Sequence, residues 1–109
     1  MKKQKRTPFE HEIVLGKNIW RWRDHLKLGP RDIGKKLKMT EKQYLQLERG
    51  AFVPLPKLEI IGKVLGQPVQ KRDIRRISFL RKLEKETGIE QVDLIGIYNE
   101  ILPHPEFEE

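Results

Sequence analysis

Side chains able to perform catalysis or bind a metal are sparse in this sequence. It contains no cysteine, and Ser78 is its only serine. Thiolate metal sites, disulfide bonds and cysteine nucleophiles are therefore excluded. Ser78 has no activating histidine and aspartate pattern. The three histidines, His11, His25 and His104, lack the spacing of metal ligands, so we expect them at the surface. The sequence predicts no enzyme, no metal site and no cofactor.

Lysine and arginine are the side chains whose distribution does point to a partner. The 109 residues include 23 Lys and Arg against 16 Asp and Glu, a net charge of +7. Residues 1–50 hold 14 basic and 6 acidic residues. Residues 71–82 hold 6 basic residues and 1 acidic residue, whereas residues 83–109 hold 1 basic residue and 8 acidic residues. Clustered positive charge attracts polyanions, so the front half favours a nucleic-acid partner, with a merely solvated basic surface as the alternative.

Length and hydropathy set the broad class of protein. A chain of 109 residues suits one small domain, and its 36% charged residues exceed the usual share of about 25%. No apolar run approaches the roughly 18 residues of a membrane span. The basic N-terminal residues are not followed by the apolar stretch of a signal peptide. We therefore expect a soluble cytoplasmic protein that makes no use of a membrane.

Apolar spacings of three and four predict an all-α fold, because no segment alternates with the period of two typical of a strand. The first helix is predicted over residues 11–28 and the third over residues 41–49. Pro30 and Pro56 open the second and fourth helices, with Gly29 as an N-cap. Thr40 and Gln43 form a capping box at the start of the third helix. Two further helices, carrying the apolar residues of 74–83 and 92–102, form a hairpin.

These elements divide the chain into four predicted segments. Residues 1–10 form a basic, flexible leader, residues 11–67 a helical domain, residues 71–103 the hairpin extension and residues 104–109 an acidic tail. Within the helical domain, two short helices flank the turn at Lys38-Met39-Thr40. Two helices joined by so tight a turn can cross at roughly 90–120°, and the second can then enter a DNA major groove.

The spacing of apolar and small residues across the first four helices resembles the Xre/Cro family of helix-turn-helix DNA-binding domains, which have the lambda-repressor-like fold. The resemblance spans about residues 13–67 without a gap. The matching positions are Leu15-Gly16-x-x-Ile19-x-x-Trp22-Arg23, Leu28-x-x-x-Asp32-Ile33-Gly34-x-x-Leu37-x-Met39-Thr40, Tyr44-x-x-Leu47-Glu48-Arg49-Gly50 and Pro54-x-x-x-Leu58-x-x-Ile61-x-x-x-Leu65-Gly66. This similarity implies a helix-turn-helix domain of four to five helices, followed here by the hairpin.

The resemblance also implies roles for individual residues. The third helix would be the recognition helix, and Arg23 and Glu48 would form a structural ion pair that holds it against the first helix. Lys and Gln donate to purine edges, and Arg contacts phosphates without reading sequence. The implied DNA-binding residues are Arg31, Thr40, Glu41, Lys42, Gln43, Gln46 and Arg49.

Four positions depart from the family pattern. Lys38 occupies a turn position that is usually Gly, and Pro30 replaces a polar residue that often contacts phosphate. Glu41 places a negative charge where DNA would approach, and Leu45 is apolar on a face that is usually small or polar. Glu41, Leu45 and the acidic end of the chain favour a second hypothesis, an antitoxin-like or coactivator-like protein-interaction module on the same fold.

The hairpin cannot bury both of its apolar stripes by itself, so it must dock on the domain or on another copy. A regulator that recognises palindromic DNA needs a two-fold dimer, and the hairpin offers a surface for one. The dimerisation candidates are Ile95, Tyr98, Ile101 and Leu102. The alternative is that the hairpin only completes the intrachain core.

The function predicted from the sequence is sequence-specific DNA binding in transcription regulation. The expected partners are double-stranded DNA and a second copy of the chain, with a protein partner of the C-terminal helices as a further possibility.

Overall fold

The computed structural model describes residues 7–105, and within them it contains six helices and no strand. The predicted all-α class is confirmed. Residues 1–6 of the predicted leader and residues 106–109 of the predicted tail lie outside the described part. The helices are α1 (Glu10–His25), α2 (Pro30–Lys36), α3 (Glu41–Glu48), α4 (Leu55–Val64), α5 (Lys71–Thr87) and α6 (Asp93–Ile101).

Local chemistry sets several of the helix ends. Gly29 is the N-cap of α2, and Pro30 is its first residue, where a missing backbone N–H leaves no bond unmade. At the start of α3, Thr40 Oγ1 accepts from the Gln43 backbone N–H, and Gln43 Oε1 accepts from the Thr40 backbone N–H, both at 3.0 Å. α5 ends at Gly88, which has a φ of 73°. The predicted starts of α2 and α3 are confirmed, whereas α1 ends at His25 rather than at residue 28.

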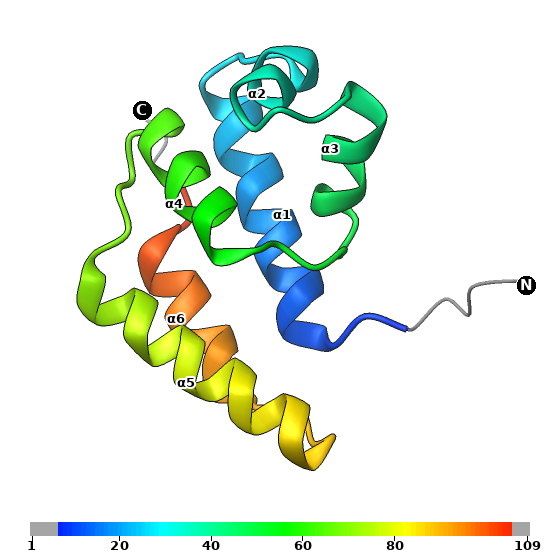
Figure 1. The fold of residues 1–109 in the computed structure, drawn as a ribbon. Helices are drawn as coiled ribbons and strands as arrows, with labels where there is room; N and C mark the ends of the chain where they lie inside the picture. The colour runs from blue at the N-terminus through cyan, green and yellow to red at the C-terminus, as the bar shows by residue number, and fades with distance from the viewer. Residues whose placement is uncertain (1–6, 106–109) are drawn as a thin grey trace, which may run out of the picture.

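Helix α1 forms the centre of the molecule, with α3 packed on one side of it and α6 along another side (Figure 1). Helix α2 packs against α3, and α5 packs against α6. The approach of α1 to α3 is close because Gly16 has no side chain. A Cβ atom at Gly16 would lie 2.6 Å from the carbonyl oxygens of both Leu47 and Glu48. Any larger residue would push the two helices apart, so Gly16 helps to place α3.

A single hydrophobic core connects all six helices. The buried residues of α1 to α4 and those of the hairpin belong to one continuous cluster. The two largest fully buried side chains are Tyr44 of α3 and Tyr98 of α6. Asn18 of α1 donates from Nδ2 to the Tyr98 carbonyl oxygen at 3.3 Å and to Asn99 Oδ1 at 2.9 Å. The hairpin therefore completes the core of the first four helices.

This packing corrects the prediction of the dimer surface. Tyr98, Ile101 and Leu102 are 0%, 8% and 1% exposed, and Ile95 is half-buried. The reason is that α6 lies along α1, so the stripe expected to meet a second copy is covered by the chain itself. These residues therefore complete the core of their own chain and do not form a surface for a second copy.

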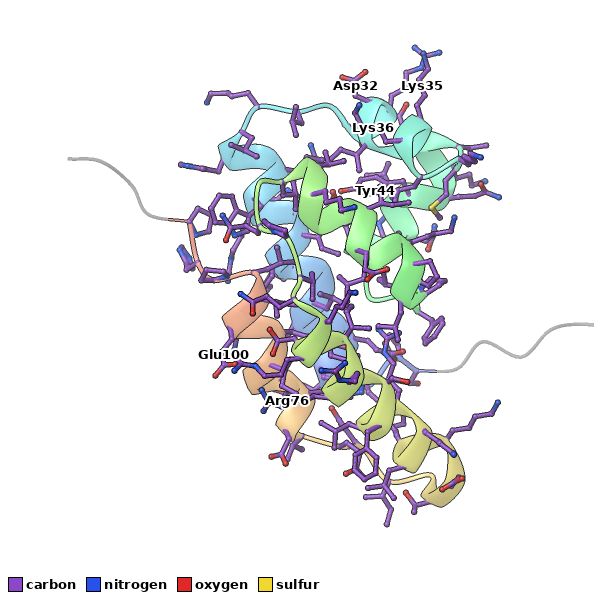
Figure 2. The ribbon with its side chains drawn as sticks, turned by 60° about the vertical axis from the view of Figure 1, so that its left-hand side comes forward. Asp32, Lys35, Lys36, Tyr44, Arg76 and Glu100 are labelled. Carbon is purple, nitrogen blue, oxygen red and sulfur yellow. The ribbon has the colours of Figure 1, made fainter. Side chains whose placement is uncertain are left out.

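The basic stretch at residues 71–82 partly faces acids of the same hairpin. Arg76 of α5 points toward Glu100 of α6 (Figure 2), and its Nη1 lies 3.9 Å from Glu100 Oε1 and 3.6 Å from Asp73 Oδ1. Exposed pairs of this kind contribute about 0–1 kcal/mol each. They orient the two helices rather than hold them together.

The turn between α2 and α3 contains a residue with a left-handed backbone. Lys38 has a φ of 59°, a conformation that costs a side-chain-bearing residue up to roughly 1 kcal/mol relative to glycine. We expect Lys38→Gly to raise the free energy of unfolding by up to about 1 kcal/mol. Urea denaturation measures the free energy of unfolding. The matched substitution is Lys36→Gly inside α2, which should lower the free energy of unfolding. A loss of stability in Lys38→Gly would contradict the strain argument.

Candidate nucleic-acid interface

Helix α3 presents its polar face to solvent on one side of the molecule. The side chains implied by the resemblance are all exposed, whereas Tyr44 and Leu47 of the same helix are buried against the core. The exposed set comprises Arg31, Thr40, Glu41, Lys42, Gln43, Gln46 and Arg49. Their exposure leaves them available for contact with a large ligand.

The capping box at the start of α3 restricts what two of these residues can offer. Thr40 Oγ1 and Gln43 Oε1 are engaged with each other's backbone N–H groups. The box leaves the two Nε2 donors of Gln43 and the hydroxyl proton of Thr40 for a ligand. Gln43 is therefore suited to donate to an acceptor, and the box holds it in place to do so.

A shallow depression of about 380 Å³ lies on the outer face of α3. One residue that the predicted site omits, Leu45, contributes to it and is half-buried. The sequence already shows that Leu45 is apolar, but the resemblance to the family implied only polar residues as DNA contacts. The lining residues are Glu41, Lys42, Leu45, Gln46 and Arg49. The depression thus combines two cations, one acid, an amide and an apolar floor.

Helix α2 adds positive charge beside α3. Lys35 and Lys36 point away from the body of the molecule on the far side of α2 from the core, and Asp32 accompanies them (Figure 2). The segment from residue 30 to residue 49 holds six basic residues and three acids, and one of those acids, Glu48, is paired with Arg23. The exposed surface of the two-helix unit consequently carries a net positive charge, as a polyanion partner requires.

Behind this surface, the predicted ion pair fixes α3 to α1. Arg23 Nε donates to Glu48 Oε2 at 2.6 Å and Nη2 donates to Glu48 Oε1 at 3.2 Å, an arrangement in which both carboxylate oxygens are used. The two side chains are 14% and 8% exposed. Arg23 Nη1 also donates to the Leu28 carbonyl oxygen at 3.0 Å. The Arg23–Glu48 pair is confirmed, and it also anchors the loop before α2.

Tyr44 is a third member of this cluster that the predicted site did not include. Its hydroxyl donates to Glu48 Oε2 at 2.5 Å, one helical turn along α3. Burial raises the pKa of Tyr44 well above its ordinary value, and the Glu48 carboxylate raises it further. The hydrogen bond to Glu48 likewise raises the pKa of Arg23. Tyr44 therefore stays protonated and Arg23 charged at physiological pH. The i, i+4 spacing of Tyr44 and Glu48 places the two side chains next to each other on a helix, so it could have predicted this contact.

One histidine does not lie where the sequence predicted. His11 is 2% exposed, and its Nε2 lies 2.7 Å from Glu84 Oε2 of α5. The surface prediction for His11 is therefore wrong, because docking of the hairpin covers the start of α1. Within residues 7–105, no group of three or more histidines and acids could hold a metal ion. No helix in the same range is long and apolar enough to span a bilayer.

No family model, curated protein or solved structure gave a significant match to this chain. The functional conclusion consequently depends on the residues described above.

Proposed function

We propose that this protein is a cytoplasmic, sequence-specific DNA-binding transcription regulator with α3 as its recognition helix. The observation that carries the proposal is the exposed polar face of α3 next to a basic α2, on a helix held rigidly by the Arg23–Glu48 pair. The likeness of residues 13–67 to the Xre/Cro sequence pattern and its lambda-repressor-like fold supports it.

The dimensions of α3 suit the proposed role. An α-helix with its side chains is about 10–12 Å in diameter, which fits the roughly 12 Å width of the B-DNA major groove. Lys42 and Gln46, one turn apart on its outer face, would donate to base edges, together with the Nε2 group of Gln43. Arg31 and Arg49 lie at the edges of the unit, where contacts to phosphates would set the register.

Glu41 has a definite function in this proposal. Its carboxylate lies in the first turn of α3, where it is favourable to the helix dipole in the absence of DNA. In the major groove a carboxylate accepts from the exocyclic amino group of cytosine and repels the acceptor edge of guanine. We therefore assign Glu41 to discrimination between bases rather than to affinity.

The proposed regulator binds DNA as a homodimer, because two copies of one short recognition helix are needed to read a palindromic operator. The surface for a second copy is not the stripe predicted from the sequence. The hairpin still exposes three apolar residues, Phe79, Ile89 and Val92, at 66%, 64% and 63%. We propose these three residues as the dimer surface in place of Ile95, Tyr98, Ile101 and Leu102.

Selection of bound sequences from a random DNA pool, repeated at two salt concentrations, tests the proposal. We expect a palindromic motif whose half-sites lie about one helical turn apart. The affinity for that motif should fall by roughly 10³-fold or more between 50 and 200 mM salt if about six phosphates are contacted. Weak binding without an enriched motif would reject sequence-specific recognition, and a single half-site would reject the dimer.

A second candidate function is a protein-interaction module on the same surface. Leu45 contributes an apolar floor to the depression on α3, and Ile13 and Trp20 of α1 are each 45% exposed next to the end of that helix. Apolar residues rimmed by charges are common at sites that bind proteins. Failure of the DNA selection would promote this antitoxin-like or coactivator-like hypothesis.

A further inference from the structure

A cavity that is partly open to solvent is lined by three parts of the chain that are remote in sequence. It lies between the start of α1, the loop after α3 and the C-terminal half of α5, and it measures about 530 Å³. That volume is in the range of about 300–1,000 Å³ typical of small-molecule sites. The lining residues are Phe9, His11, Glu12, Phe52, Arg81, Lys82, Glu84 and Lys85.

The walls of this cavity are aromatic and held in place. Phe9 stacks on His11 with ring centroids 5.5 Å apart, and the Arg81 guanidinium lies over the Phe52 ring at 4.7 Å. Arg81 is itself fixed, because its Nη1 donates to the Val53 carbonyl oxygen at 2.8 Å and its Nε donates to the Tyr98 hydroxyl at 3.2 Å. Phe52 is nevertheless 55% exposed, so one face of its ring remains for a ligand.

The acids that line the cavity are already satisfied by the protein. Glu12 Oε1 accepts from the Phe9 backbone N–H at 2.8 Å. Glu84 Oε2 accepts from the Gln91 backbone N–H at 3.0 Å and lies 2.7 Å from His11 Nε2. Both carboxylates are buried, with 8% and 9% of each residue exposed. Their negative charge is therefore directed into the protein rather than toward a ligand.

The cations at the rim are not satisfied in the same way. Lys82 and Lys85 are exposed, and across residues 7–105 neither forms an ion pair or hydrogen bond. Together with Arg81 they place three positive charges within two turns of α5 at the edge of an aromatic cavity. A site with apolar walls and a cationic rim is complementary to a molecule that has a flat ring and one negative charge.

We propose that this cavity binds a small aromatic carboxylate, with its ring against Phe9 and Phe52 and its carboxylate at Lys82 and Lys85. The inference concerns a site separate from α3 and does not depend on the proposed DNA binding. The wall residue Phe52 belongs to the loop that directly follows α3. A ligand bound in the cavity would therefore contact the loop that connects the recognition helix to the core.

Fluorescence titration with anilinonaphthalene sulfonate tests the site, because this dye has the proposed ring and anion and brightens in apolar surroundings. Naphthoate should displace it. We expect Phe52→Ala to weaken dye binding roughly ten-fold through lost ring contact. The double variant Lys82→Glu/Lys85→Glu should also weaken it roughly ten-fold, since two attractions become repulsions. Binding of uncharged phenylnaphthylamine should depend on Phe52 only.

Matched controls locate the site. Ile60→Ala removes an exposed apolar side chain from α4, and Lys71→Glu reverses a charge on α5, both outside the cavity. Neither should change the dye affinity. Loss of binding in Ile60→Ala but not in Phe52→Ala would overturn the assignment. Equal losses for the charged and uncharged dyes in the lysine variant would reject the anionic ligand, and failure of naphthoate to compete would reject the carboxylate. The lysine variant tests the site even if Phe52→Ala is unstable.

Discussion

Replacing Lys42 and Gln46 together by alanine is expected to lower affinity for the selected operator by about 100-fold or more while leaving the fold intact. Each well-placed donor to a base edge is worth about 1–3 kcal/mol of discrimination, and both lie on the outer face of α3. Neither side chain makes a contact that supports the core, because both are exposed. Gel-shift or fluorescence-anisotropy titration measures the affinity, and thermal melting checks the fold.

The matched control for this experiment is Lys63→Ala combined with Gln70→Ala. It removes the same two chemical groups from exposed positions in α4 and in the turn before α5. The control should retain operator binding, apart from a small change due to net charge. If the α3 variant binds its operator as the parent does, α3 is not the recognition helix. If both variants lose binding equally, the effect is long-range charge alone.

Replacing Glu48 by alanine is expected to lower the free energy of unfolding by about 3 kcal/mol or more. Removing one member of a buried pair leaves the other charge without compensation, at a cost of roughly 3–5 kcal/mol. Here the Arg23 guanidinium and the Tyr44 hydroxyl both lose their acceptor in a position that is largely shielded from water. Small domains have a free energy of unfolding of about 5–15 kcal/mol, so this loss is a large part of the total stability.

Chemical denaturation and thermal melting measure the effect, and two variants bracket it. Glu48→Gln retains an acceptor oxygen of similar shape but loses the charge, so it should be less destabilised than Glu48→Ala. Glu59→Ala removes an exposed carboxylate from α4 and should change stability by less than about 0.5 kcal/mol. An unchanged melting temperature in Glu48→Ala would show that the pair does not hold α3 to α1.

The starts of α2 and α3 could be predicted from the sequence because their causes are local. Thr40 and Gln43 are three residues apart and satisfy each other's backbone groups, and Pro30 has its φ preset for a helix start. Lys38 stands where the helix-turn-helix pattern usually has glycine, and its φ of 59° shows that the backbone there is left-handed. The candidate interface follows from the same local rules, since exposure on α3 is set by helical periodicity.

Partners between distant segments could not be predicted in this way. Periodicity shows which stripe of α6 is apolar, but an apolar stripe packs equally well against its own domain or a second copy. The position of α6 along α1 decided that Tyr98 and Leu102 are core residues. The Arg23–Glu48 pair was predicted only through resemblance to a family, and the third member, Tyr44, was not predicted at all.

By itself, the sequence determined the all-α class, the starts of α2 and α3 and the polar face of α3 beside a basic α2. These depend on backbone hydrogen bonds and side-chain spacing within a few residues. Only the tertiary structure decided that the hairpin closes the core, that His11 is buried against Glu84 and that Phe9, Phe52 and Lys85 share one cavity. Such contacts arise where whole surfaces fit, and no local pattern encodes which surfaces meet.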